Sequence, residues 1–523
     1  MSVIANPDVP VKRSVTRTLN VPLNRVEGDL RIRVEVDGDT VSNAWSSGTM
    51  YRGFENMLRG RGALDGLVIT PRVCGICGTA HLTAAANALD VIFKTQPPPD
   101  ALRARNLALM TEHLQSDMRQ AFLMFMSDFA NPAYEALPLY EEAVRRYAPF
   151  KGETAIETIR QTKEVIEIVA VLGGQWPHSS YMVPGGVATT LNQVDLLQCQ
   201  HLLASFKAWY ERRVLGCPVA RWLDVQSIAD LDAWLDKDDS HRNSDLGFYI
   251  RFAREIGLAD VGRGHDNFIS CGALELPADS QVRGRGNSDT HLIPAGFARG
   301  TRVSPFEQKE VAEHVAHSWF EDYEGGRHPF EGETRPHATG EEGKKYSWAK
   351  APRYEGLPAE TGPLAEMIIS GHPLFTDLVG RDGANAFVRE LARLVRPAEL
   401  MPAMERWASE LTADDTLYVP RGDVTEGEGV GLTEATRGAL GHWVKIADRK
   451  IQHYQIITPT AWNGSPRDAE GVRGPWEEAL IGTPVGDPAN PVMLGHVVRS
   501  FDPCLVCAVH VVRGTRSLAR KTV

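Results

Sequence analysis

Four cysteines of this chain have the type and spacing of metal ligands. Cys74 and Cys77 form one CxxC pair near the N-terminus, and Cys504 and Cys507 form a second pair near the C-terminus. Each spacing puts two sulfur atoms within reach of one metal ion, and four thiolates suit zinc as well as nickel or iron. The spacing alone therefore leaves a structural zinc site open. Zinc ribbons, however, usually separate their pairs by about 15 to 20 residues, so a metal shared between the chain ends would organise the whole fold.

The composition is that of a globular protein with a sizeable core. The 523 residues include 43% hydrophobic and 24% charged residues and carry a net charge of -11. A negative charge argues against nucleic acid as a partner, because phosphate backbones attract basic surfaces. We find no apolar run of about 18 residues that would cross a membrane and no secretory signal in residues 1–20. Seven cysteines in a chain of this length indicate metal or redox chemistry rather than a disulfide framework.

Long helices are the elements expected to position the cysteines. Apolar residues recur at helical spacing in four long segments, which predicts a helical bundle. These segments are residues 100–128, 153–172, 194–215 and 384–411. Residues 18–41 alternate between apolar and charged and predict a half-buried strand pair, whereas residues 217–365 are rich in Gly, Pro, His and charge and predict short strands with long surface loops. The expected fold class is mainly α with smaller β-sheets (α+β), in which both chain ends meet at the metal site within one interwoven domain over 1–523.

Several motifs resemble those of a single family. Residues 72–77 followed by His81, and residues 502–507 followed by His510, are similar to the two signature motifs of [NiFe]-hydrogenase large subunits. Five further segments fit the same family in the same order. They are residues 24–28, 51–55, 177–186, 434–442 and 454–463. The chain thus resembles the large, catalytic subunit over nearly its full length, and it is most similar to the uptake hydrogenases of cyanobacteria and actinobacteria.

This resemblance implies a nickel-iron centre on the four cysteines. Cys74 and Cys504 would be terminal nickel ligands, while Cys77 and Cys507 would bridge nickel and iron. The iron would carry CO and cyanide, giving a Ni-Fe(CN)2(CO) centre. Because no side chain can supply those diatomic ligands, the resemblance also implies maturation proteins as partners.

The resemblance gives roles to five residues around the metals. Glu27 would be the catalytic proton relay, because burial beside a thiolate raises a carboxyl pKa towards the working range. Arg437 would lie over the metals, where it hydrogen-bonds a cyanide or assists H2 cleavage as a base, and Asp502 would hydrogen-bond near it. Pro503 would shape the pocket wall, and His81 would donate a hydrogen bond to a cluster sulfur. Residue type alone would make Glu27 a surface glutamate and His81 a core histidine.

A magnesium ion is implied near the C-terminus. Its ligands would be the Glu55 carboxylate, the backbone carbonyl of Ile456 and the His510 side chain. Magnesium prefers oxygen donors, so the histidine rests on the resemblance alone.

The sequence departs from the family pattern near these residues. Asp29 stands where many members have histidine, Thr436 stands where many have proline, and Asp117 lies in a stretch where some members have an active-site aspartate. These differences bear on oxygen tolerance and catalytic bias and leave the four ligands untouched. Three other cysteines fit no ligand pattern and are expected to be buried apolar residues. They are Cys199, Cys217 and Cys271.

The chain end and the cysteine count predict partners. Residues 511–523 resemble a maturation peptide that an endopeptidase removes, and H2-sensing relatives generally lack one. We therefore favour an enzyme that oxidises H2, with an H2-sensing regulatory subunit as the alternative; the cofactor-less relative in respiratory complex I lacks the four cysteines. Because no further cysteine cluster is present for iron-sulfur ligation, electrons would pass to an iron-sulfur small subunit in a heterodimer or higher oligomer. The expected location is the cytoplasm, or a membrane to which partners attach the enzyme.

Overall fold

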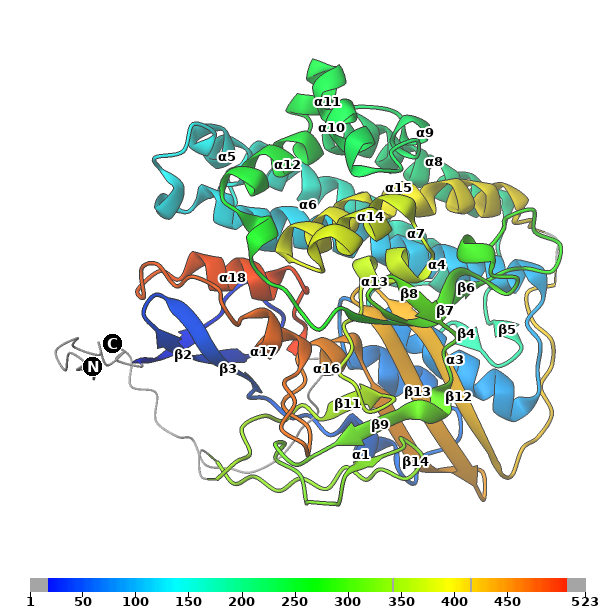
Figure 1. Ribbon diagram of the computed structural model, residues 1–523. Helices are drawn as coiled ribbons and strands as arrows, with labels where there is room; N and C mark the ends of the chain where they lie inside the picture. Colours follow the sequence, from blue (N-terminus) through cyan, green and yellow to red (C-terminus); the bar gives the residue numbers. More distant parts are fainter. Residues whose placement is uncertain (1–16, 341–342, 414–415, 506–523) are drawn as a thin grey trace, which may run out of the picture.

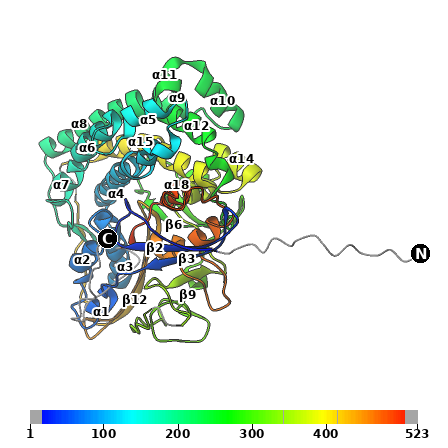
Figure 2. The same ribbon diagram turned by 90° about the vertical axis from the view of Figure 1, so that its left-hand side faces the viewer.

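The computed structural model describes residues 17–340, 343–413 and 416–505. Figure 1 shows long helices in the upper half of the molecule and small sheets in the lower half. The view turned by 90° agrees, with α4 to α12, α14 and α15 together above β2, β3, β9 and β12 (Figure 2). The chain is 44% helical and its sheets are small and antiparallel, which confirms the expected α+β class.

The predicted helical bundle forms around α4 and α15, which pack against each other. Its helices are α4 (Pro99–Arg119), α5 (Tyr140–Tyr147), α6 (Glu153–Val165), α7 (Glu167–Gly173), α8 (Gln193–Trp209), α14 (Pro373–Asp382) and α15 (Ala386–Glu410). All four predicted helical segments are confirmed, with differences in detail. The predicted 153–172 helix is two helices, because α6 ends at Val165 and α7 begins at Glu167. A π-helical turn, Gln120–Phe125, continues α4.

The prediction of strands and loops over 217–365 is wrong for its first part, which is helical. The structure has α9 (Val219–Trp222), α10 (Ile228–Lys237), α11 (Asp239–Asn243) and α12 (Asp245–Glu255) there. Ser227, Asp238 and Ser244 each cap the helix that follows by accepting a backbone N–H. The rest of the segment has the predicted short strands. They are β6 (Asn267–Glu275), β7 (His291–Arg299), β8 (Arg302–Ser304), β9 (Val311–His314), β10 (Gly326–Arg327) and β11 (Ala351–Tyr354).

The sheet nearest the cysteines is a meander of three antiparallel strands with one helix against it. Its strands are β12 (Gly427–Ala435), β13 (Gly438–Ala447) and β14 (Lys450–Ile457), and the helix is α3 (Gly78–Phe93). Glycines on β12 let α3 approach closely: a Cβ at Gly431 would lie 1.8 Å from the carbonyl oxygen of Ala84. This contact sets the start of α3, just after the first CxxC pair, beside the turn between β12 and β13.

The N-terminal residues form a sheet beside the C-terminal helix α18 (Val492–Arg499), as Figure 1 shows in blue and red. The sheet has β1 (Arg17–Pro22), β2 (Leu30–Asp37) and β3 (Thr40–Gly48), so the predicted strand pair is extended by a third strand. The predicted inward face of β2 is confirmed, since Leu30, Ile32, Val34 and Val36 are all buried.

Short elements complete the described chain. They are α1 (Phe54–Leu58), α2 (Gly66–Ile69), β4 (Met182–Val183), β5 (Gly186–Val187), α13 (Pro363–Ile369), α16 (Pro459–Asn463) and α17 (Pro475–Ala479). Among the described residues, no helix combines the length and apolar character needed to cross a bilayer.

Candidate metal centre

Cysteines from opposite ends of the chain meet in the core. The Sγ atoms of Cys74 and Cys504 lie 3.6 Å apart, and both side chains are almost completely buried. Two thiolates on one tetrahedral metal with bonds of about 2.3 Å would lie about 3.8 Å apart, whereas a disulfide needs about 2.05 Å. Cys77 is also buried and stands directly before α3. Cys74 and Cys504 thus have the separation expected of two thiolates on one metal, and Cys507 lies outside the described residues.

Backbone pairing holds the two ends together. The N–H of Glu27 donates to the carbonyl oxygen of Pro503 at 3.2 Å, and the N–H of Leu505 donates to the carbonyl oxygen of Glu27 at 2.6 Å. The N–H of Cys504 donates to the hydroxyl of Thr460, at the start of α16, at 3.1 Å. The expected meeting of the N- and C-terminal segments is thus confirmed, and Pro503 lies in the pairing segment itself.

Glu27 lies beside the thiolates rather than at the open surface. Burial is the main cause that raises the pKa of its carboxyl group, and the negative charges of Cys74 and Asp502 raise it further. The positive charge of Arg437 opposes these effects. A carboxyl group in this setting holds a proton at higher pH than a solvated glutamate, as a proton relay requires.

Arg437 lies at the turn between β12 and β13 and faces the cysteines. Its Nε lies 3.1 Å from a carboxylate oxygen of Asp502 and donates to the Asp502 carbonyl oxygen at 3.2 Å. Burial acts to lower the pKa of Arg437, but Asp502 and the three thiolates of Cys504, Cys74 and Cys77 together raise it well above its ordinary value. The guanidinium is therefore a fixed positive charge beside the sulfur atoms.

A second layer of buried ion pairs, which the sequence did not predict, supports this arginine. Arg393 on α15 lies 3.3 Å from Asp502 and 3.4 Å from Asp117 on α4. One turn further along α15, Arg396 bonds both carboxylate oxygens of Asp117, at 2.8 and 2.7 Å, and donates to Glu366 at 2.6 Å. Asp117 was noted in the sequence only as a departure, and no periodic pattern marks the two arginines as ion-pair partners.

His81 belongs to a hydrogen-bonded chain of aromatic side chains. Its Nδ1 lies 3.2 Å from Nε2 of His442 on β13, and Nδ1 of His442 lies 2.9 Å from the hydroxyl of Tyr454 on β14. Both partners fall within the sequence segments that carried the family resemblance, at 434–442 and 454–463. The resemblance gave them no role.

Comparison with known proteins identifies the kind of protein to which this centre belongs. The sequence model of the nickel-dependent hydrogenase family matches residues 52–133 and 153–510, which is most of the chain. The chain belongs to this family. The periplasmic [NiFeSe] hydrogenase large subunit of Desulfomicrobium baculatum is 34% identical over 545 residues, covering 98% of this chain and 97% of the relative. The uptake hydrogenase large subunit of Bradyrhizobium diazoefficiens is 28% identical, covering 94% of each chain.

Solved structures agree with the sequence comparison. The Ni-Fe-Se hydrogenase of Desulfovibrio vulgaris Hildenborough in its reduced state superposes with a TM-score of 0.77 at 31% identity, covering 95% of this chain and 100% of that chain. This hydrogenase large subunit is therefore an H2 oxidoreductase with a nickel-iron centre. Its relatives are large subunits, which implies a small-subunit partner. The sequence has cysteine at all four positions that are predicted to bind the metals.

Of the predicted magnesium ligands, Glu55 and Ile456 lie close together, but their contact uses the N–H of Ile456 rather than the predicted carbonyl oxygen. Glu55, on α1, accepts a hydrogen bond from the N–H of Ile456 at 3.1 Å and another from the hydroxyl of Thr334. They line a small enclosed cavity that Glu313 and Lys350 share, and the Lys350 ammonium lies 3.5 Å from the Glu313 carboxylate. Carboxylate oxygens suit a hard cation, but the Lys350 ammonium already supplies a positive charge to this cavity. His510 lies outside the described residues, so this donor set is incomplete.

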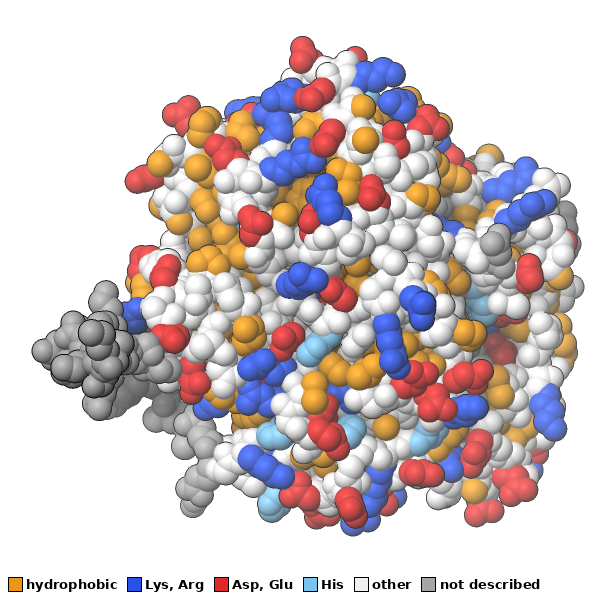
Figure 3. All heavy atoms as spheres, in the orientation of Figure 1, with side chains coloured by type: hydrophobic (Ala, Val, Ile, Leu, Met, Phe, Trp, Pro, Cys, Tyr) orange, Lys and Arg blue, Asp and Glu red, His pale blue; other side chains and the backbone are white. Residues whose placement is uncertain are grey.

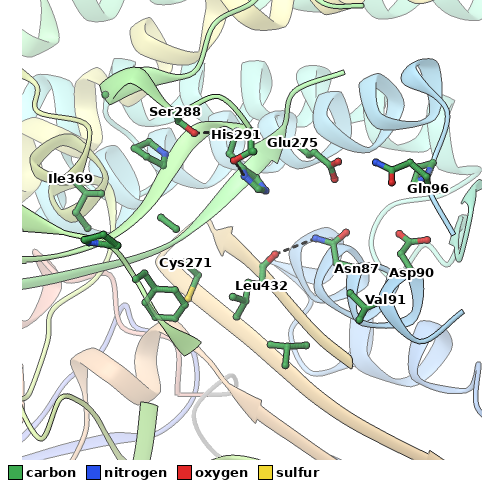
Figure 4. Close-up of a pocket in the computed structure, with 18 of the residues that line it drawn as sticks. Asn87, Asp90, Val91, Gln96, Cys271, Glu275, Ser288, His291, Ile369 and Leu432 are labelled. Atoms are coloured by element: carbon green, nitrogen blue, oxygen red, sulfur yellow. Dashed lines mark hydrogen bonds between the residues drawn. The ribbon is translucent and has the colours of Figure 1, made fainter. Parts of the chain in front are cut away.

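A much larger cavity of this hydrogenase subunit is lined by none of Cys74, Cys77 and Cys504. It has a volume of about 1100 Å³ and opens between α3, β6, β7 and β12. Figure 4 shows Asn87, Asp90 and Glu275 on one side and Cys271 with Ile369 on the other. The three cysteines expected to be buried are all buried, including Cys271. Cavity size alone would thus have suggested a functional site at a different place from Cys74, Cys77 and Cys504.

Proposed function

We propose that the buried thiolates hold a Ni-Fe(CN)2(CO) centre at which H2 is oxidised, and that the electrons pass to an iron-sulfur small subunit. The observation that carries the proposal is the 3.6 Å approach of Cys74 and Cys504 beside Glu27 and Arg437. Cys77 and Cys507 would complete the ligand set and would bridge nickel and iron. When bound, such a centre supplies heterolytic cleavage of H2 and accepts its electrons.

The side chains around the thiolates divide the remaining work. Glu27 takes up the proton from the site, because its raised pKa lets it hold a proton at higher pH than a solvated glutamate. Arg437 provides a permanent positive charge and donor groups over the metals, where it hydrogen-bonds a cyanide or assists cleavage. Asp502 holds the arginine through two contacts. Pro503 shapes the pocket wall, and His81 donates a hydrogen bond to a sulfur of the centre.

Further partners and cofactors belong to the same proposal. Maturation proteins would build the diatomic ligands, and an endopeptidase would remove residues 511–523, which lie outside the described residues. Magnesium would bind to Glu55, the Ile456 carbonyl and His510. The proposed compartment is the cytoplasm, with membrane attachment only through partners; the named relative from D. baculatum is periplasmic, so fractionation of cells that produce the heterodimer is the test.

Metal analysis and infrared spectroscopy of the purified, mature heterodimer test the proposal. We expect one nickel per heterodimer with iron in excess of nickel, because the small subunit also carries iron-sulfur clusters, together with infrared bands of CO and cyanide and rapid reduction of an artificial dye under H2. Zinc without those bands would replace the proposal with a structural zinc site. Bands with only very slow dye reduction would instead favour an H2-sensing subunit.

A further inference from the structure

The chain of His81, His442 and Tyr454 is enclosed by protein along its whole length. The three side chains are 1%, 0% and 4% exposed. They come from α3, β13 and β14, which the close approach of α3 to the sheet brings together. The backbone of α2 covers the phenol end, since a Cβ at Gly66 would lie 3.3 Å from the Tyr454 hydroxyl oxygen. Water therefore has little room to supply a hydrogen-bond partner there.

The phenol end sets the direction in which the hydrogen bonds run. Among the described residues, the only hydrogen-bond partner of the Tyr454 hydroxyl is Nδ1 of His442. A phenol carries its proton at neutral pH. A buried hydroxyl proton without an acceptor is unfavourable, so Tyr454 donates to His442. Nδ1 of His442 is then an acceptor, and the ring carries its proton on Nε2.

The proton on His442 Nε2 determines which nitrogen of His81 is protonated. His442 Nε2–H donates to Nδ1 of His81 at 3.2 Å, so Nδ1 of His81 is also an acceptor. A neutral imidazole carries one N–H, which leaves the proton of His81 on Nε2. His81 lies in the first turn of α3, four residues after Cys77, which directly precedes that helix. The Nε2–H donor of His81 therefore belongs to the first turn after the first CxxC pair.

We propose that Tyr454 and His442 are positioning residues that fix His81 in its Nε2–H tautomer, so that His81 donates to a thiolate of the metal centre. The acceptor in this inference rests on the proposed function, whereas the direction of the two described hydrogen bonds does not. The opposite direction would turn a nitrogen lone pair of His81 towards negatively charged sulfur and leave the Tyr454 proton without an acceptor. The hydrogen-bonded chain thus links the phenol of Tyr454 on β14 to His81, which follows the first CxxC pair.

Infrared spectra of the CO and cyanide bands in the purified heterodimer provide a test that does not depend on turnover. A hydrogen bond to a bridging thiolate withdraws electron density from iron, so its loss lowers the CO stretching frequency. We expect Tyr454→Phe and His442→Leu to shift the CO band to lower wavenumber. His442→Gln is expected to keep the wild-type position, because its amide N–H can donate to His81 while its oxygen accepts from Tyr454.

Tyr249→Phe is the matched control. It also removes a buried hydroxyl, one that donates to the Phe387 carbonyl oxygen at 2.8 Å in the helical bundle, and should leave the bands unchanged. An unshifted band in Tyr454→Phe, or an equal shift in Tyr249→Phe, would overturn the inference. Loss of nickel from Tyr454→Phe and His442→Gln alike would also overturn it, since the chain would then only hold the fold. Absence of the bands from the wild-type protein is distinguishable, because it removes the proposed function itself.

Discussion

Glu27 illustrates how position gives a common side chain a chemical role. A glutamate after a short N-terminal strand would be unremarkable by residue type. In the fold, its backbone pairs with Pro503 and Leu505 on the other end of the chain, which puts its carboxyl group beside Cys74. The raised pKa follows from that burial and from neighbouring negative charge rather than from any property of the local sequence.

The proposed relay predicts a large effect of Glu27→Gln on turnover. The amide keeps the size of the side chain but can neither take up nor release a proton, so H2-dependent dye reduction should fall by about 10²–10⁴-fold. Nickel content and the infrared bands should stay as in the wild type. Asp37→Asn, which changes an exposed acid at the end of β2, serves as control. Turnover within about threefold of the wild type would assign the proton path to another group.

Among single residues, the sequence predicted the metal ligands but not the buried ion pairs around Arg437. The cysteines, Glu27 and Arg437 stand in contiguous motifs, and the structure brings those of them that it describes together. Arg393 and Arg396 were not predicted because their partners on α4 are distant in sequence. A buried arginine on an amphipathic helix has the same local pattern as an exposed one, and only the packing of α15 against α4 distinguishes them.

The segment from Val219 to Glu255 shows why elements can be missed. Its helices α9 to α12 are short, so the helical period barely repeats, and Gly, His and charged residues dominate the composition of the wider region. Caps define these helices instead: Ser227 accepts the N–H of Asp230 at 3.1 Å, three residues on, at the start of α10. An S-x-x-D pattern before Leu231 and Trp234 was the local signal that a search for periodicity overlooked.

Ser227→Ala should therefore loosen α10. Loss of an N-cap generally costs about 0.5–2 kcal/mol, and Ser227 is a cap whose hydroxyl also bonds the Asp230 carboxylate. We expect faster amide hydrogen exchange in residues 228–237, with exchange in α15 unchanged. Ser227→Thr retains a hydroxyl that can accept the N–H of Asp230 and donate to its carboxylate, and it should exchange like the wild type. Equal protection of α10 in the alanine and wild-type proteins would show that its packing, not its cap, sets its stability.

The link between β3 and α17 predicts how stability depends on pH. The buried carboxylate of Glu477 accepts hydrogen bonds from the N–H of Ser46 at 2.9 Å and the hydroxyl of Tyr346 at 2.7 Å, and burial raises its pKa from 4.5 to about 7. Between these values the folded protein keeps a proton that the unfolded chain has released. Its stabilising contribution is thus complete below pH 4.5 and is lost as pH rises to about 7.

Glu477→Gln removes this dependence, because an amide does not titrate. The variant should gain stability relative to the wild type between pH 5 and pH 8, by on the order of 3 kcal/mol at most. Thermal unfolding at the two pH values measures the difference, with the exposed Glu331→Gln as a control that should show none. A difference between variant and wild type that stays constant with pH would mean that Glu477 titrates normally.

The whole molecule is organised around the meeting of its N- and C-terminal segments. The motif order predicted that the termini meet, and the α+β class and bundle followed from apolar periodicity. The stacking of α3 on β12 was not predictable, since it depends on glycines whose contacts lie far away in sequence.

On the face in Figure 3, acidic and basic side chains are interspersed, so the net negative charge is not concentrated in one patch there. One interwoven domain over 1–523 stays a prediction.

Arg499 joins parts of the chain that are distant in sequence, next to the place where the two chain ends meet. From the end of α18 it donates to the Asn24 carbonyl oxygen at 2.9 Å and to the Asp128 carboxylate at 2.5 Å, while Gln120 donates to its own carbonyl oxygen at 2.6 Å. Arg25 also pairs with Asp128. Residues 502–505 follow directly, so the position of Cys504 depends on this anchor.

Arg499→Met should therefore weaken both the fold and the metal site. Removal of one partner from a buried ion pair generally costs about 3–5 kcal/mol, moderated here because Arg25 still pairs with Asp128. We expect a lower unfolding temperature and, in protein matured alongside the wild type, a lower nickel content per heterodimer. Arg242→Met removes an exposed ion pair with Asp236 and should change stability by at most about 1 kcal/mol. If Arg499→Met matched Arg242→Met in both measurements, closure of the chain ends would depend on the backbone pairing of Glu27 with Pro503 and Leu505 alone.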